Sequence, residues 1–141
     1  MKLSVKGIKA VSASPKTKDY PVFLNDEATK PVRKLHSSLT GYEPTPLVVL
    51  DKLAKELGVK NIYVKDESKR FSMNAFKALG ATYAMARVLC DRLGVSIDEA
   101  DFNYFKSEEV KAKIADLVFV TATDGNHGRA VAWTAQMLGC K

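Results

Sequence analysis

Lys77 is the residue whose surroundings in this sequence most favour chemistry. It lies in the stretch Asn-Ala-Phe-Lys-Ala-Leu-Gly at 74–80, just inside the expected start of a helix. The positive end of the helix dipole and the apolar neighbours both favour the neutral form of its amine. A neutral amine can attack an aldehyde and form a Schiff base. Local sequence alone favours a simpler interpretation, a lysine whose stem packs on the core while its charge reaches water.

A second group of polar residues, Thr-Ala-Thr-Asp-Gly-Asn-His-Gly at 121–128, is expected to join a buried strand to a helix. Ligands bind at such strand ends in open α/β sheets, and helix N-termini attract anions. The carboxylate of Asp124 can act as a base, and the amide of Asn126 can donate and accept hydrogen bonds. Gly125 and Gly128 allow a flat ligand to approach the backbone.

This second group also has a structural interpretation. Asp124 or Asn126 can serve as the N-cap of the following helix, with the glycine between them serving the turn. His127 is then a hydrogen-bonded structural histidine. Because the only other histidine, His36, lies far upstream, the sequence predicts no metal site.

Hydrophobic periodicity places both groups on an alternating set of helices and strands. The expected elements are a helix over 47–57, a strand over 61–65, a helix over 75–93, a helix over 96–105 opened by a Ser96–Glu99 capping box, a helix capped by Ser107, a strand over 117–122 and a final helix ended by Gly139. The near-continuous apolar run at 117–122 is typical of a strand covered on both faces in a parallel sheet. We therefore expect an α/β fold in which layered helices surround a mostly parallel sheet.

The order of these elements indicates two regions. Residues 1–34 are expected to form an N-terminal arm, since Pro15, Pro21 and Pro31 break regular helix, although Asn25-Asp26-Glu27 resembles a helix cap. Residues 35–141 carry the α/β pattern. Two or three strands are few for such a sheet, so we expect an incomplete, N-terminal part of a larger protein.

Composition excludes several classes of protein. The 141 residues carry a net charge of +6 from 22 basic and 16 acidic residues, without the basic and aromatic interleaving of a nucleic-acid surface. A mild basic balance fits anionic small ligands. The sequence contains no apolar run of membrane-spanning length and no apolar segment of a signal peptide at its start. Two cysteines without metal-ligand spacing indicate free thiols in a cytoplasmic protein.

Three blocks of sequence, at 42–47, 64–81 and 123–128, occur in an order and spacing that resembles a known family. This is the tryptophan-synthase-β-like family of pyridoxal-phosphate enzymes of fold type II, which includes threonine and serine dehydratases, threonine synthase and cysteine synthase. The resemblance covers the chain from about residue 10 to its end. Within the family, the variants Asn-Ala-Phe-Lys and Thr-Ala-Thr-Asp-Gly-Asn-His-Gly are most similar to the ammonia-lyases that act on diaminopropionate.

The resemblance implies roles for the residues singled out above. Lys77 would hold pyridoxal 5'-phosphate as a Schiff base and exchange protons, and Asn126 would hydrogen-bond the phenolic oxygen of the cofactor. Asp124 would be the base that removes the α-proton of a D-amino acid. The substrate carboxylate would be received by the turn that contains Gly125, His127 and Gly128.

The implied reaction is the α,β-elimination of 2,3-diaminopropionate to pyruvate and ammonia, with a small amino acid as substrate and a homodimer when full length. Two alternatives stay open: a threonine or serine dehydratase, against which Asp124 and Asn74-Ala75 argue, and a fragment without catalytic activity. The family's glycine-rich phosphate-binding loop, the group facing the pyridine nitrogen and a second catalytic aspartate are not found among the 141 residues. This departure also indicates the N-terminal part of an enzyme.

Overall fold

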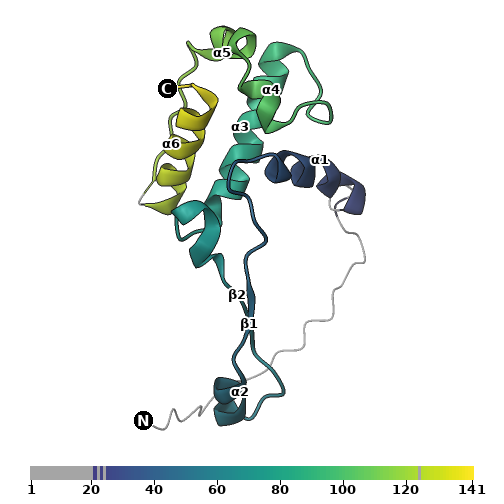
Figure 1. Cartoon of the computed structure of the whole chain (residues 1–141), viewed down its shortest axis with the longest axis vertical. Helices are drawn as coiled ribbons and strands as arrows, with labels where there is room; N and C mark the ends of the chain where they lie inside the picture. Colours follow the sequence, from purple (N-terminus) through teal and green to yellow (C-terminus); the bar gives the residue numbers. More distant parts are fainter. Residues whose placement is uncertain (1–20, 22, 24, 124) are drawn as a thin grey trace.

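The computed structural model describes residues 21, 23, 25–123 and 125–141. Its elements, labelled in Figure 1, are α1 (Asp26–Ser37), β1 (Leu47–Val49), α2 (Asp51–Leu57), β2 (Tyr63–Lys65), the 3-10 segment η1 (Glu67–Ser72), α3 (Lys77–Leu93), α4 (Phe102–Phe105), α5 (Glu108–Ile114) and α6 (Asn126–Leu138). The helices α1 and α3 to α6 form one body. The ribbon of β1 and β2, with α2 at its far end, projects from that body (Figure 1).

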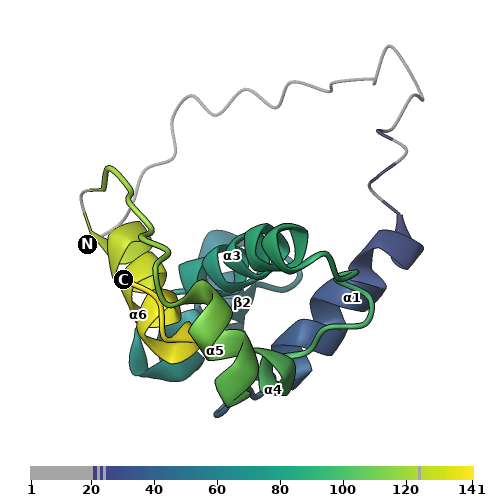
Figure 2. The ribbon, with the colours of Figure 1, turned by 90° about the horizontal axis from the view of Figure 1, so that it is seen from above.

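The long helix α3 is the centre of the helical body. Its buried residues recur at helical spacing and therefore form one face: Ala78, Ala81, Thr82, Met85, Ala86, Leu89 and Cys90. This helix packs against α6 and α1, and Figure 2 shows the arrangement from above. Phe102, Phe105 and Ile114 from α4 and α5, together with Leu138, complete the main core. Both cysteines are free thiols, as expected.

The β ribbon differs from the expected sheet. β1 pairs with β2 in antiparallel register, with Leu47 opposite Lys65, and these two strands form the sheet of the described residues. The helix expected over 47–57 is wrong in its first part, because residues 47–49 form β1 and the helix starts at Asp51. The β-branched Val48 and Val49 favour strand geometry.

The buried parallel strand expected over 117–122 is not confirmed. No strand is assigned there, and the side chains of Val118 and Val120 are 62% and 89% exposed. Lys141 nevertheless bonds to two residues of this segment. Its N–H donates to the carbonyl of Leu117 at 2.9 Å, and its carbonyl accepts from the N–H of Phe119 at 2.7 Å. One residue bonding to two residues on either side of Val118 is the pattern of a parallel pair.

Helix ends follow the sequence in most places. Asn25 caps α1 through its side chain, which accepts a hydrogen bond from the N–H of Ala28 at 2.8 Å. Ser107 caps α5 in the same way. The capping box at 96–99 was expected to open a helix but forms a turn, because Asp101 supplies the cap from which α4 starts. Pro31 does not break the helix around it but lies inside α1.

The expected N-terminal arm falls largely on residues 1–20, 22 and 24, which lie outside the described residues. The proposed boundary between residues 34 and 35 lies inside α1. Within the described ranges, no helix combines the length and the apolar character that crossing a bilayer requires.

Candidate functional site

Lys77 is the first residue of α3. Phe76 occupies the N-cap position, where its side chain makes no capping hydrogen bond, and its ring is 61% exposed. The Lys77 side chain is also exposed, so the described residues do not supply the burial that its apolar sequence neighbours indicated. An exposed amine at a helix start is open to a ligand.

The turn that leads to Lys77 has an unusual backbone. Phe71, Ser72 and Asn74 have φ values of 48°, 56° and 56°, and they are the non-glycine residues with positive φ in the described part of the chain. Each such residue costs on the order of 1 kcal/mol or more, although asparagine tolerates this conformation better than phenylalanine does. We refer to residues 71–74 as the left-handed turn. Surrounding contacts must hold it.

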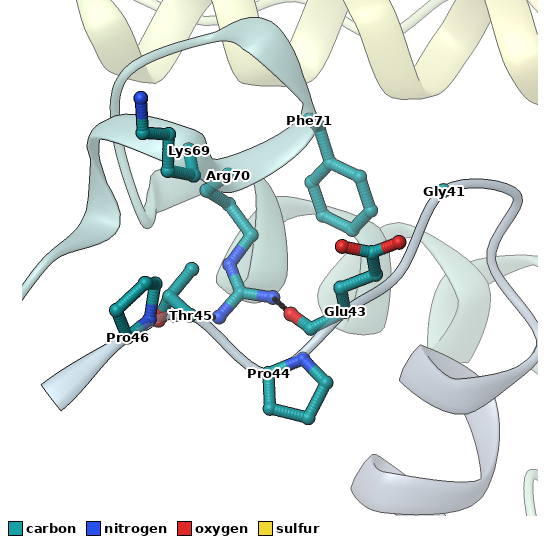
Figure 3. A pocket seen from close by; sticks show the side chains of 8 residues that line it. All are labelled: Gly41, Glu43, Pro44, Thr45, Pro46, Lys69, Arg70 and Phe71. Carbon is teal, nitrogen blue, oxygen red and sulfur yellow. Dashed lines mark hydrogen bonds between the residues drawn. The ribbon is translucent and has the colours of Figure 1, made fainter.

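Arg70 supplies one set of these contacts (Figure 3). Its side chain is 5% exposed and makes two hydrogen bonds to the carboxylate of Glu67, from Nε at 2.8 Å and from Nη2 at 3.1 Å. Nη1 donates to the carbonyl of Glu43 at 2.7 Å, and Nη2 also donates to the hydroxyl of Thr45 at 3.3 Å. The Thr45 hydroxyl in turn donates to Glu67. We call Arg70, Glu67 and Thr45 the arginine clamp.

Aromatic rings supply the second set of contacts. The Phe71 ring lies 4.9 Å from the Trp133 ring of α6 and 6.4 Å from the Tyr42 ring, measured between centroids. The Arg70 guanidinium lies 5.3 Å from the Tyr42 centroid and 5.7 Å from the Phe71 centroid, within the range of cation–π attraction. The left-handed turn is therefore tied both to α6 and to the segment that precedes β1.

The arginine clamp also shapes the local electrostatics. Hydrogen bonds from Arg70 are the main reason that the pKa of Glu67 falls to about 2, and the Thr45 hydroxyl lowers it further. The pKa of Arg70 is raised, chiefly by the same carboxylate. His36 lies nearby, and its Nε2 donates to the carbonyl of Leu79 in α3 at 2.8 Å. Burial lowers the pKa of His36.

The start of α6 is held differently. The hydroxyl of Thr123 accepts hydrogen bonds from the N–H groups of Gly125 at 3.2 Å and Gly128 at 2.8 Å. Asn126 is the first helical residue, so the expectation that it is the N-cap is wrong. Any Cβ at Gly128 would lie 2.1 Å from Cγ2 of Thr123, which leaves room only for glycine. The side chains of Asn126 and His127 are exposed, and Asp124 lies outside the described residues.

The two helix starts lie at the same end of one helix pair. Ala78 and Ala81 in the first turns of α3 pack with Ala130 in the second turn of α6. Figures 1 and 2 show α3 and α6 side by side. In Figure 1 both helices run in the same direction, away from the end at which they start. The structure therefore brings the helix that starts at Lys77 beside the helix that starts at Asn126. We call this end the paired helix starts.

A cavity of about 280 Å³ lies next to the arginine clamp but not at the paired helix starts (Figure 3). Its lining includes Glu43, Pro44, Lys69 and Arg70, and none of the residues that the sequence predicted for a site. The donors of Arg70 that face this region are used by Glu43 and Thr45. The residues that the sequence predicted for a site lie at the paired helix starts and not at this cavity.

Comparison with known proteins agrees with the resemblance drawn from the sequence. A family described as pyridoxal-phosphate dependent enzyme matches residues 39–141. The diaminopropionate ammonia-lyase of Escherichia coli K12 is 50% identical over 119 residues, which are 84% of this chain and 29% of that enzyme. The Salmonella typhimurium LT2 enzyme of the same name is 48% identical over 118 residues, with the same shares. The chain thus spans about three-tenths of the length of these relatives.

Solved structures give the same result. The Escherichia coli diaminopropionate ammonia-lyase in its apo form matches with a TM-score of 0.77 and 46% identity, covering 86% of this chain and 32% of that one. The same enzyme in complex with D-serine matches with a TM-score of 0.72 and 42% identity, covering 86% and 30%. The matched region is part of a fold type II enzyme, whose cofactor is pyridoxal phosphate. The chain belongs to the family of pyridoxal-phosphate-dependent enzymes.

Proposed function

We propose that this chain is part of an ammonia-lyase that converts 2,3-diaminopropionate into pyruvate and ammonia. One observation carries the proposal: the exposed Lys77 and the exposed start of α6 lie at the same end of one packed helix pair. The relatives named above are diaminopropionate ammonia-lyases, and they are longer than this chain. The activity is therefore proposed for a complete polypeptide that contains this segment.

The residues at the paired helix starts fit the aldehyde end of pyridoxal phosphate. Lys77 offers an exposed amine that can bind the aldehyde covalently, next to the exposed ring of Phe76. Asn126 offers an exposed amide that can donate to the phenolic oxygen. When bound, the cofactor supplies an electron sink for the carbon that loses its proton.

The start of α6 fits the carboxylate of an amino-acid substrate. The N–H groups of Asn126 and His127 lie in the first turn, where no carbonyl of the same helix can accept from them. Such groups attract anions. The turn of Gly125, His127 and Gly128 would then orient the substrate, with the Thr123 hydroxyl holding the shape of the turn.

Asp124 is proposed as the base that takes the α-proton of D-diaminopropionate. This role rests on the sequence motif, since Asp124 lies outside the described residues. Loss of the α-proton and of the β-amino group as ammonia leaves an enamine. Water hydrolyses the enamine to pyruvate and a second ammonia. We further infer a cytoplasmic location and a homodimer when full length.

The test compares a full-length protein containing this segment with its Lys77→Ala variant. We expect the unaltered protein to acquire visible absorbance with pyridoxal phosphate and to release pyruvate from diaminopropionate faster than from serine or threonine. The variant should lose both properties. An unchanged cofactor spectrum in Lys77→Ala would exclude Lys77 as the attachment point, and faster release from serine or threonine would favour a dehydratase.

A further inference from the structure

We propose that Arg70 is a positioning residue for Lys77: through Glu67, Glu43 and Thr45 it holds the left-handed turn that sets where α3 starts. The inference rests on the proposed function in one respect, the cofactor-binding role of Lys77. Arg70 itself lies seven residues before Lys77 and acts on it only through the turn.

The first step of the argument is the connectivity of Arg70. Its four hydrogen bonds reach the carboxylate of Glu67 within η1 and two acceptors in the segment before β1. The planar guanidinium matches this set of acceptors, whereas a lysine ammonium is a single point charge. The Thr45 hydroxyl, which bonds to both Arg70 and Glu67, closes the network. Arg70 therefore joins two segments that are 25 or more residues apart.

The second step is the backbone that follows. Arg70 leaves the helical region with a ψ of 110°, and Phe71 then takes φ 48° and ψ 29°. The carbonyl of Arg70 accepts from the N–H of Met73 at 2.8 Å, which closes the turn. Phenylalanine disfavours this backbone conformation, so the guanidinium and the rings of Tyr42 and Trp133 must hold it. The buried side chain and the strained backbone are thus neighbours in one chain segment.

The third step is the helix start. Phe76 provides no side-chain cap, so the turn that ends at Asn74 decides where α3 begins. If this turn relaxed to the right-handed conformation, the helix could extend toward its N-terminus. Lys77 would then lie in the helix interior, and its direction relative to the start of α6 would change. Holding the turn therefore holds Lys77 at the first position of α3, at the paired helix starts.

The experiment uses Arg70→Lys and Glu67→Gln in the full chain. Glu108→Gln is the matched control, because Glu108 pairs with Lys111 at the same i,i+3 spacing but is 90% exposed. Two quantities are measured by peptide mass spectrometry: amide hydrogen exchange along the chain, and borohydride-trapped labelling by pyridoxal phosphate at Lys77 relative to Lys69. Lys69 lies in the same segment and is also exposed.

We expect both clamp variants to accelerate exchange over residues 71–79 by about tenfold, and to lower the ratio of Lys77 to Lys69 labelling by a similar factor. The control should change neither quantity. A uniform rise of exchange across all helices, with an unchanged labelling ratio, would overturn the proposal and leave the clamp as a purely structural element.

A second pair of variants keeps the proposal testable if the clamp variants do not fold. Asn74→Gly preserves access to positive φ. In Asn74→Ala, the methyl group of alanine makes positive φ unfavourable. We expect Asn74→Ala, and not Asn74→Gly, to lower the Lys77 labelling ratio. Equal ratios in both variants would overturn the proposal. If the unaltered chain shows no preference for Lys77 over Lys69, the cofactor role fails, while the exchange data still decide whether Arg70 holds the turn.

Discussion

The starts of α3 and α6 perform the same structural task with different means. The start of α3 follows a turn of non-glycine residues in the left-handed region, held by the buried Arg70 and by the rings of Tyr42 and Trp133, which contact the ring of Phe71. The start of α6 is held by one hydroxyl, that of Thr123, against a glycine with no room for a side chain. At the start of α3, many contacts together offset the free-energy cost of the left-handed backbone. At α6, a single methyl group is enough to disrupt the geometry.

The largest loss of stability is expected from Gly128→Ala. The added Cβ would meet Thr123 Cγ2 at 2.1 Å and Thr123 Cβ at 3.0 Å, so either the turn or the helix must move. Overpacking of this kind costs about 1 to 3 kcal/mol. We expect a loss of stability near the upper end of that range, measured by denaturant unfolding of the full chain.

Two variants sharpen this result. Gly80→Ala is the matched control, since nothing lies within 4 Å of a Cβ at Gly80 inside α3. The control should raise stability by up to about 1 kcal/mol, because alanine favours helix over glycine. Thr123→Ser removes Cγ2 but keeps the hydroxyl, so it should rescue Gly128→Ala in part, since Thr123 Cβ at 3.0 Å and Oγ1 at 3.2 Å stay close. Equal effects of alanine at positions 80 and 128 would show that the contact at Thr123 is not limiting.

A smaller effect is expected from the pH dependence of the arginine clamp. The pKa of Glu67 in the folded chain is about 2, below its ordinary value of 4.5. The folded state therefore binds fewer protons than the unfolded state between these values, and stability falls as the pH drops from 4.5 to 2. With allowance for solvent screening of a side chain that is 20% exposed, the loss is about 2 kcal/mol.

Glu67→Gln tests this expectation. Its difference in unfolding free energy from the unaltered chain should shrink as the pH falls from 4.5 to 2. The same change at Glu109, whose pair with Lys113 is exposed, should give a smaller pH-dependent difference because water screens that pair. Parallel stability curves for the unaltered chain and Glu67→Gln would contradict the assigned pKa.

Removal of the Thr123 hydroxyl should lower the free energy of unfolding by about 1 kcal/mol. Thr123→Val keeps the shape of the side chain but removes the acceptor for the N–H groups of Gly125 and Gly128. Thr121→Val is the control, because the Thr121 hydroxyl bonds only to the carbonyl of Ala122 at 3.3 Å among the contacts of the described residues. Similar losses of stability in both variants would indicate that the Thr123 hydroxyl does not stabilise the start of α6 through these two hydrogen bonds.

The sequence predicted the helices better than the strands. α3 and α6 occur close to their expected ranges because apolar periodicity and a terminal glycine agree in each, and α5 starts after the expected cap Ser107. The run at 117–122 has the composition of a buried strand, yet Val118 and Val120 are exposed. The apolar composition of a segment indicates that its side chains need neighbouring elements to bury them. It does not indicate whether the described residues supply those elements.

The positions of two candidate site residues were predicted from the sequence, whereas the residues that support them were not. Lys77 and Asn126 stand at helix starts, as the two sequence motifs indicated, and the structure adds that both starts lie on the same end of a helix pair. Arg70 and Glu67 have no role in the site that the sequence predicts. Their i,i+3 spacing was visible in the sequence, but the contacts of Arg70 with Glu43 and Thr45 join positions far apart in the chain. Local patterns cannot reveal such contacts.

The smallest expected effect concerns His36, which connects α1 to the first turns of α3 through the Leu79 carbonyl. Burial, and secondarily the charge of Arg70, lowers the pKa of His36 below its ordinary value of 6.5 in the folded chain. The unfolded chain therefore binds the proton first, and stability present above pH 6.5 declines as the pH falls below it.

His36→Gln keeps a side-chain N–H donor but removes this titration, so its stability should not change in the same interval. Denaturant unfolding between pH 7.5 and about 5 measures the difference. If the unaltered chain and His36→Gln respond equally to pH, the link between α1 and α3 does not depend on the neutral histidine. The start of α3 would then rest on the arginine clamp and the aromatic rings alone, which would deepen its contrast with the start of α6.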